Sequence, residues 1–234
     1  MIDFHSHILP GIDDGSRSVE ESLQLLGALA DAQVDTVAAT SHFYATHRSP
    51  EEFLERRGRA YERLRAELPD SGVPRILLGA EVLYFPGISR MEELPRLCLE
   101  GTNILLLEMP FTAWSEYMIR EVNELARSGR FTLLMAHIER YYFKQDVSVW
   151  DSFLDDGIVM QSNADFFLPF STRRKALRLL KAGRIHLLGT DCHNMTSRPP
   201  RMAEAVKVIR SRLGQGVLEE MDALGRQLLR EAAI

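Results

Sequence analysis

Short apolar segments alternate with amphipathic segments along the whole chain, and this alternation predicts the fold. Seven apolar runs of about four to six residues predict strands that are covered on both faces. These runs occupy residues 2–5, 36–40, 76–81, 104–108, 132–137, 158–163 and 186–190. Continuous apolar runs of this length are typical of parallel sheets, in which helices cover both sides.

The amphipathic segments between these runs predict helices. Residues 18–21 and 49–52 each read Ser-x-x-Glu, which is the pattern of a capping box at a helix start. Pro50 stands at the first helical position, where its missing N–H costs nothing. Leucines follow the first of these signals at helical spacing. Further helices are predicted over residues 114–128, 171–181, 202–213 and 218–232.

The repeated order of strand, helix and strand indicates parallel βαβ units. Seven such units can form either an open doubly wound sheet or a closed barrel. No Gly-x-Gly-x-x-Gly follows the first run, which weakens the dinucleotide-binding version of the open sheet. We therefore predict an α/β fold with a distorted seven-stranded, TIM-like (β/α) barrel. No linker or low-complexity segment divides residues 1–234, so we expect one domain.

Composition excludes several classes of protein. The chain is 45% hydrophobic, and its 28 Lys and Arg against 33 Asp and Glu give a net charge of −5. This balance argues against binding to nucleic acid or to an anionic membrane surface. Two cysteines cannot form a disulfide framework. The N-terminus lacks the apolar core of a signal peptide, and no apolar stretch is long enough to span a bilayer. We expect a cytoplasmic protein without membrane insertion.

Histidines and acidic residues gather where the predicted strands end. An isolated histidine is usually an ordinary core or surface residue. Here, however, five of the seven histidines share this placement with three acids. The ends of parallel strands converge on one mouth, where catalytic groups of such folds lie. The pattern therefore predicts a metal site formed by His5, His7, His42, Glu81, Glu108, His137, Asp191 and His193.

Two short motifs sharpen this prediction. His5 and His7, like Asp191 and His193, are two residues apart, so in an extended segment both side chains of a pair point to the same side. Imidazole suits zinc, manganese or iron, and the nearby carboxylates favour a harder metal than structural zinc. The Asp-Asp-Gly sequence at residues 13–15 is either an ordinary turn or a loop that folds Asp14 over the mouth.

The opening sequence, MIDFHSHILPGIDDGS, closely resembles that of bacterial protein-tyrosine phosphatases of capsule and exopolysaccharide synthesis. These enzymes belong to the polymerase-and-histidinol-phosphatase (PHP) superfamily. The blocks ATSH, GAEV, LEMP, HIERY and DCHN also match the family, and they occur in the same order along the chain. The chain departs from the family pattern at Ser41, Phe43 and Ile138. The resemblance implies the PHP fold, a distorted seven-stranded barrel with three divalent metal ions, most often Mn²⁺.

The resemblance also assigns roles to single residues. The first ion is implied to bind His5, His7, Glu81 and Asp191; the second Glu81, Glu108 and His137; and the third Asp14, His42 and His193. Arg140 and Arg198 match the two arginines that hold the phosphate in this family. Iron or zinc could replace manganese. The charge of three divalent ions would exceed that of the four carboxylates, and the arginines add positive charge that suits a phosphate dianion.

The function implied by the resemblance is that of a metal-dependent protein-tyrosine phosphatase, in which metal-activated water attacks phosphorus. Its partner would be a phosphotyrosine-bearing protein, the C-terminal tail of a bacterial tyrosine kinase that regulates capsule synthesis. An oligomer is compatible with the sequence. Two alternatives are a histidinol-phosphatase-like enzyme that hydrolyses small phosphomonoesters and a metal-binding scaffold without turnover.

Two further segments carry competing interpretations. Residues 192–198 read Cys-x5-Arg, the signature of cysteine-dependent tyrosine phosphatases. That chemistry needs a glycine-rich phosphate loop at a helix N-terminus, and this stretch contains no glycine. The aromatic run at residues 141–143 either packs in the core or lines the mouth and stacks on a phenol ring.

Overall fold

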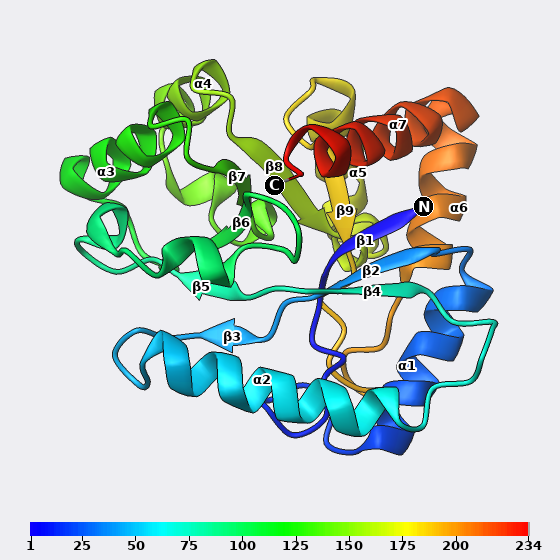
Figure 1. Cartoon of the computed structure of the whole chain (residues 1–234). Helices are drawn as coiled ribbons and strands as arrows, with labels where there is room; N and C mark the ends of the chain where they lie inside the picture. The colour runs from blue at the N-terminus through cyan, green and yellow to red at the C-terminus, as the bar shows by residue number, and fades with distance from the viewer. Residues whose placement is uncertain (234) are drawn as a thin grey trace.

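The computed structural model describes residues 1–233 (Figure 1). Each of the seven predicted apolar runs contains a strand, so this prediction is confirmed. The strands are β1 (Ile2–Ser6), β2 (Thr36–Ala39), β3 (His42–Phe43), β4 (Arg75–Leu78), β5 (Glu81–Leu83), β6 (Ile104–Glu108), β7 (Thr132–Met135), β8 (Val159–Asn163) and β9 (Leu187–Gly189). The helices are α1 (Val19–Asp31), α2 (Pro50–Arg65), α3 (Glu116–Arg127), α4 (Val147–Asp155), α5 (Phe170–Lys181), α6 (Met202–Leu213) and α7 (Gln215–Glu231).

The strands form a curled, parallel arrangement with helices on its outer side (Figure 1). One sheet has the order β1-β2-β4 and the other the order β3-β5-β6-β7-β8-β9. The chain passes from the first sheet to the second at two places: Thr40 and Ser41 separate β2 from β3, which lies beyond the predicted run at 36–40, and Gly79 and Ala80 interrupt the predicted run at 76–81 and separate β4 from β5. The prediction of an α/β fold with parallel strands is therefore confirmed.

Strand β1 is also connected to the other sheet through the segment that follows β9. The N–H of Asp191 donates to the carbonyl of His5 at 2.7 Å, and the N–H of His7 donates to the carbonyl of Cys192 at 2.9 Å. The buried carboxylate of Asp3 accepts hydrogen bonds from both the N–H and the hydroxyl of Thr190. These contacts bring the beginning of the chain beside a segment almost two hundred residues later.

The helices begin largely where the sequence signals predict. Ser49 forms the complete capping box with Glu52 at the start of α2. At the start of α1 the box is incomplete: Ser18 accepts from the N–H of Glu21, but the carboxylate of Glu21 accepts from the N–H of Arg17. Helix α4 was not predicted. Within residues 1–233, no helix combines the length and apolarity that crossing a membrane requires.

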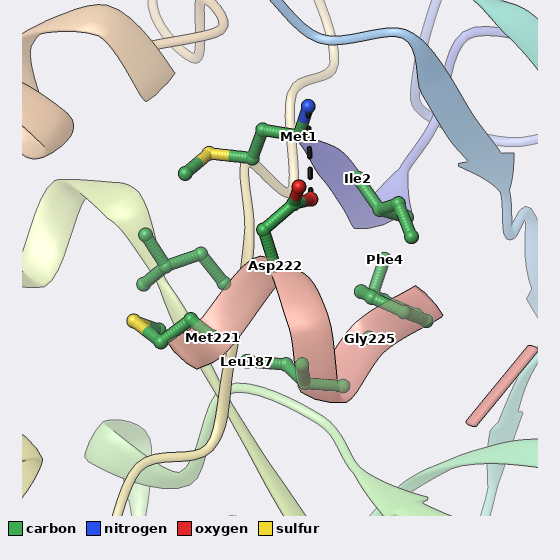
Figure 2. Close-up of a pocket in the computed structure, with 8 residues that line it drawn as sticks. Met1, Ile2, Phe4, Leu187, Met221, Asp222 and Gly225 are labelled. Atoms are coloured by element: carbon green, nitrogen blue, oxygen red, sulfur yellow. Dashed lines mark ion pairs between the residues drawn. The ribbon is translucent and has the colours of Figure 1, made fainter. Parts of the chain in front are cut away.

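The amino ends of the strands are closed by α7. Figure 2 shows the ammonium of Met1 above Asp222, 3.7 Å from its carboxylate, with Phe4 and Gly225 beside it. A β-carbon on Gly225 would lie only 2.8 Å from the ring of Phe4, so α7 approaches β1 closely at this position. The remaining cavity has room for about 10 Å³, which is at most one water molecule. This cavity between β1, β9 and α7 is therefore too small for a ligand larger than water.

Candidate metal centre

The predicted metal-type residues converge at the carboxyl ends of the strands, around the carboxylate of Glu81. One oxygen, Oε2, lies 3.2 Å from Nε2 of His5 and 3.3 Å from Nε2 of His7. The same oxygen lies 2.8 Å from Nδ1 of His42. The other oxygen, Oε1, lies 2.7 Å from Nε2 of His137. A single buried carboxylate thus faces four imidazoles from three segments: two from the end of β1, one from β3 and one from the segment after β7.

The other predicted residues surround this group. Oδ1 of Asp191 lies 3.4 Å from Nε2 of His7, and Oε1 of Glu108 lies 3.4 Å from Nε2 of His137. The carboxylate of Asp14 is exposed, and its Oδ1 lies 3.4 Å from Nε2 of both His42 and His193. The loop after β1 therefore folds Asp14 over the mouth, as one of the two interpretations of the Asp-Asp-Gly sequence required.

The donor atoms form compact groups that fit divalent cations. Among the described residues, three sets place their donor atoms within 4.8 Å of one another: His7, Asp14, His42 and His193; His5, His7 and Glu81; and His42, Glu81 and Glu108. Buried polar atoms normally have hydrogen-bond partners. In the described part of the chain, Nε2 of His193 is buried and has no hydrogen-bond partner, and Oε2 of Glu81 and Nδ1 of His42, although 2.8 Å apart, do not meet in the geometry of a hydrogen bond. Imidazole and carboxylate donors left free in this way suit Mn²⁺, Fe²⁺ or Zn²⁺.

Electrostatics keep the central carboxylates ionised. Burial alone would raise the pKa of Glu81, but the charge of His5 and hydrogen bonds from neighbouring imidazoles hold it well below its usual value. Burial likewise opposes ionisation of Asp191, and His5 and His7 lower its pKa well below the usual range. Two buried negative charges surrounded by imidazoles form a site that favours cations.

Two arginines lie at the edge of this centre. Arg140 follows β7 in the short 3₁₀ helix η3 (Ile138–Arg140), and Arg198 belongs to the loop between β9 and α6. Both guanidinium groups contact Oδ2 of Asp191, Arg198 at 2.7 Å. About a third of each side chain is exposed, 33% and 35% respectively. They line a cavity of about 300 Å³ together with Asp191, Asn163 and Pro199, so a ligand in this cavity meets both arginines and one of the predicted metal ligands.

The sequence did not identify Asp13, whose carboxylate forms hydrogen bonds with two residues of the centre, His7 and His42. Its Oδ2 accepts a hydrogen bond from Nδ1 of His7 at 2.8 Å and another from the N–H of His42 at 2.9 Å. Its Oδ1 accepts from the N–H of Gly15 at 3.0 Å, which closes the turn. Because His7 then presents Nε2 to the centre, Asp13 fixes the orientation of that imidazole. The Asp-Asp-Gly pattern gave no signal for this role, since it already accounts for an ordinary turn.

Two amides of β8 form a second support that the sequence analysis missed. Oε1 of Gln161 accepts from the N–H of His137 at 2.7 Å and lies 3.3 Å from Nδ1 of His5. Nε2 of Gln161 donates to Asn163, whose own amide donates to Asp191 at 2.8 Å. A signal existed in the sequence: two amides two residues apart in an apolar strand point to one face.

Two residues of the centre have an unusual backbone conformation. His137 has φ 30° and Asp191 has φ 51°, both in the left-handed region. Residues other than glycine rarely adopt this region, at a cost on the order of 1–3 kcal/mol when the surroundings impose it. Each lies two residues after the end of a strand, His137 after β7 and Asp191 after β9, so the left-handed turn directs its side chain into the mouth.

The aromatic run at residues 141–143 divides between core and surface. Tyr141 is fully buried, and its ring packs 5.0 Å from that of Trp114. Tyr142 stacks on Trp150, whereas Phe143 is exposed beside Lys175. For Tyr141 the core interpretation holds.

Substituting Cys192 with serine is expected to leave metal-dependent turnover within about twofold of the starting protein. The thiol is fully buried, and burial, together with the charge of Asp3, raises its pKa to about 12. A thiol of this kind is no nucleophile, because the thiolate is the reactive form. Steady-state phosphatase assays of the variant check this, and a loss of all turnover with unchanged metal content would contradict it.

Substituting Asp13 with asparagine is expected to weaken metal binding by about 10- to 100-fold. The amide loses the negative charge that faces Nδ1 of His7, while the size of the side chain is preserved. Titration with Mn²⁺, followed by the thermal stabilisation that binding causes, measures the effect. The matched control is Asp70→Asn, on the exposed loop that precedes β4, which is expected to bind as the starting protein does. Equal affinities for Asp13→Asn and the starting protein would exclude this role.

Comparison with known proteins agrees with this geometry. The family described as "Capsular polysaccharide synthesis, CpsB/CapC" matches residues 1–225, nearly the whole chain. The chain belongs to the CpsB/CapC family. The tyrosine-protein phosphatase CpsB of Streptococcus pneumoniae is 29% identical to this family member over 233 residues, which cover 94% of each chain. The tyrosine-protein phosphatase YwqE of Bacillus subtilis is 27% identical over 240 residues, which cover this chain completely and 93% of YwqE.

Solved structures extend the comparison. This CpsB/CapC protein matches a structure from the work on YwqE of B. subtilis and CpsB of S. pneumoniae, described as unique metal-dependent tyrosine phosphatases. The TM-score is 0.85 at 25% identity, over 100% of this chain and 96% of the other. The histidinol phosphate phosphatase of Lactococcus lactis, solved with zinc, L-histidinol and phosphate, gives a TM-score of 0.55 at 15% identity and shares the fold. It covers 90% of this chain and 92% of its own.

Proposed function

We propose that this protein is a metal-dependent phosphatase that hydrolyses phosphotyrosine in proteins. The observation that carries the proposal is the convergence of nine imidazole and carboxylate side chains with two arginines on one mouth. A metal centre beside two guanidinium groups suits a phosphate dianion. The full-length similarity to CpsB and YwqE, named as tyrosine-protein phosphatases, supports phosphotyrosine as the substrate.

We assign the centre to three divalent ions. One set of ligands is His5, His7, Glu81 and Asp191; a second is Glu81, Glu108 and His137; and a third is Asp14, His42 and His193. We propose Mn²⁺ as the ion, with iron and zinc as alternatives that the same donors accept. Such ions, when bound, supply Lewis acidity that stabilises negative charge and makes water a nucleophile near neutral pH.

The side chains of the protein bind and orient the substrate. Each guanidinium has five donors in a planar fork, so Arg140 and Arg198 can keep Asp191 and still bind phosphate oxygens. Their positive charge neutralises the oxygens on which charge develops during in-line transfer of the phosphoryl group. Asp13 holds the imidazole of His7 in place, and Gln161 contacts the imidazole of His5 and holds the backbone N–H of His137, so little reorganisation accompanies the reaction.

The finer description of the fold is also part of this proposal. We infer that β2 and β3 together form one bent strand of a distorted seven-stranded barrel, and that β4 and β5 together form another. We also propose that the barrel is a single domain over residues 1–234. The hydrogen bonds that join β1 to the segment after β9 support closure. Active sites of such barrels lie at the carboxyl ends of the strands, which is where this centre lies.

We further propose a protein partner rather than a small metabolite. The arginines are partly exposed at the edge of the cavity, so a phosphotyrosine on an extended segment can reach them. The sequence resemblance points to the C-terminal tail of a cytoplasmic bacterial tyrosine kinase of capsule synthesis. An oligomeric form is compatible with this substrate.

The test is a comparison of two substrates after controlled metal loading. The chain is stripped with EDTA, reloaded with Mn²⁺, Fe²⁺ or Zn²⁺, and assayed with a phosphotyrosyl peptide and with histidinol phosphate. We expect no turnover without metal, recovery with Mn²⁺, and a higher kcat/KM for the peptide. Full activity in excess EDTA with no bound metal would refute the proposal, and a preference for histidinol phosphate would favour the small-molecule alternative.

A further inference from the structure

An exposed phenylalanine lies beside the candidate metal centre, and it is not among the residues assigned to the metal ions or to the phosphate. Phe111 lies three residues after Glu108, in the loop that follows β6, and 47% of it is exposed. Its ring centre lies 5.9 Å from that of His137. The guanidinium carbon of Arg140 lies over the same ring, 5.7 Å from its centre. Phe111 therefore contacts both a predicted metal ligand and a predicted phosphate-binding arginine.

The loop that carries Phe111 is held by a ring contact and by two hydrogen bonds to its backbone carbonyls. The ring lies 6.3 Å from that of the fully buried Tyr141. The carbonyl of Phe111 accepts a hydrogen bond from Nζ of Lys144 at 3.0 Å, and the carbonyl of Thr112 accepts one from Nε2 of Gln145 at 2.9 Å. A large apolar ring is thus held in advance with about half of its surface open to the solvent, at a position where exposure gains nothing for folding.

The other exposed aromatic side chains do not share this position. Phe170 is 90% exposed, and its ring lies under the guanidinium of Arg173. Phe143 lies beside Lys175. Tyr117 lies under the guanidinium of Arg120. Tyr44, which is half-buried, stacks on His42 and has neither Arg140 nor Arg198 over its ring among the described residues. Phe111 is distinguished by its contacts with both Arg140 and His137.

We propose that Phe111 is a specificity-determining residue that stacks on the aryl group of the substrate and favours aryl over alkyl phosphates. The inference rests on the proposed function, since it takes Arg140 as a ligand of the phosphate. In phosphotyrosine a single oxygen joins the phenyl ring to the phosphorus, so the ring stays within reach of Phe111 when Arg140 binds the phosphate. An aromatic pair of this kind contributes about three- to tenfold in affinity.

The experiment uses the manganese-loaded protein and measures how strongly two inert phosphonates, phenylphosphonate and methylphosphonate, competitively inhibit its hydrolysis of a phosphotyrosyl peptide. We expect Phe111→Leu to weaken inhibition by phenylphosphonate three- to tenfold and to leave inhibition by methylphosphonate unchanged. Leucine keeps an apolar side chain in the loop but removes the aromatic face. Phe111→Tyr, which keeps the ring, is expected to retain the preference for phenylphosphonate. The matched control is Phe170→Leu, which removes another exposed ring that lies under an arginine and is expected to change neither inhibition constant.

The outcomes separate this inference from the proposed function. If the starting protein hydrolyses the phosphotyrosyl peptide and Phe111→Leu shifts both inhibition constants equally, or neither, the role of Phe111 is refuted and the phosphatase stands. If the starting protein hydrolyses no phosphate ester with any metal, the proposed function fails first. Metal content is measured for every variant, and a loss of metal in Phe111→Leu that accounts for the weaker inhibition also overturns the inference.

Discussion

Replacing Glu81 with glutamine is expected to abolish metal loading and to lower turnover by about 10³-fold or more. The reason is the position of this carboxylate, whose two oxygens face His137 on one side and His5, His7 and His42 on the other. Glutamine has almost the same volume, but it brings no charge and places an amide nitrogen where a donor oxygen is required. The cations would then lose the anion that two of the three proposed sites share.

The measurement combines metal analysis of the purified variant with a phosphotyrosyl peptide assay. The matched control is Glu121→Gln, because Glu121 is also a buried glutamate. Its carboxylate accepts hydrogen bonds from the hydroxyl of Tyr84 and from the N–H of Gly87, neither of which belongs to a predicted metal ligand. We expect this control to keep its metal even if it loses stability. Normal metal content and turnover in Glu81→Gln would show that the assigned centre is wrong.

Replacing Arg140 with alanine is expected to lower kcat/KM for a phosphotyrosyl peptide on the order of 10²–10³-fold while metal content stays normal. The guanidinium contacts Asp191 at the edge of the cavity and keeps a third of its surface exposed, so it can bind a phosphate without lining the metal site itself. Arg140→Lys is expected to restore only part of the loss, because an ammonium cannot reproduce the planar pair of donors.

The control for this prediction is Arg201→Ala. Arg201 lies three residues after Arg198, is 46% exposed and forms an ion pair of 3.6 Å with the exposed Asp165. Exposed pairs contribute little, so this variant is expected to behave as the starting protein does. A fall in kcat/KM of the same size in both variants would mean that the effect reflects general surface charge. Equal kcat/KM in Arg140→Ala and the starting protein would remove Arg140 from the phosphate site.

The residues of the centre were predictable because parallel strands leave a simple trace in a sequence. Each apolar run ends at the mouth, so a histidine or acid directly after a run, such as Glu108 or His137, lies there whatever the details of the barrel. Asp14 was less certain because it lies in a loop, and only the structure shows that its carboxylate returns over His42 and His193.

What the sequence could not predict depends on contacts between distant segments. Strand β3 lies just beyond the predicted run at 36–40, and the break at Gly79 falls within the predicted run at 76–81. Periodicity therefore gives no sign that the chain passes from β2 and β4 in one sheet to β3 and β5 in the other. The role of Asp13 depends on the direction in which the ring of His7 points, which is set by tertiary structure. The support from Gln161 depends on β8 lying beside β7.

The left-handed conformation of His137 and Asp191 decides how the centre can be altered without disturbing the chain around it. Any substitution at these two positions changes a ligand and also changes the ease with which the backbone turns. Asparagine tolerates positive φ better than most residues, so His137→Asn and Asp191→Asn probe the lost donor with the least added distortion. Alanine or a branched residue at either position would mix a chemical defect with a conformational one.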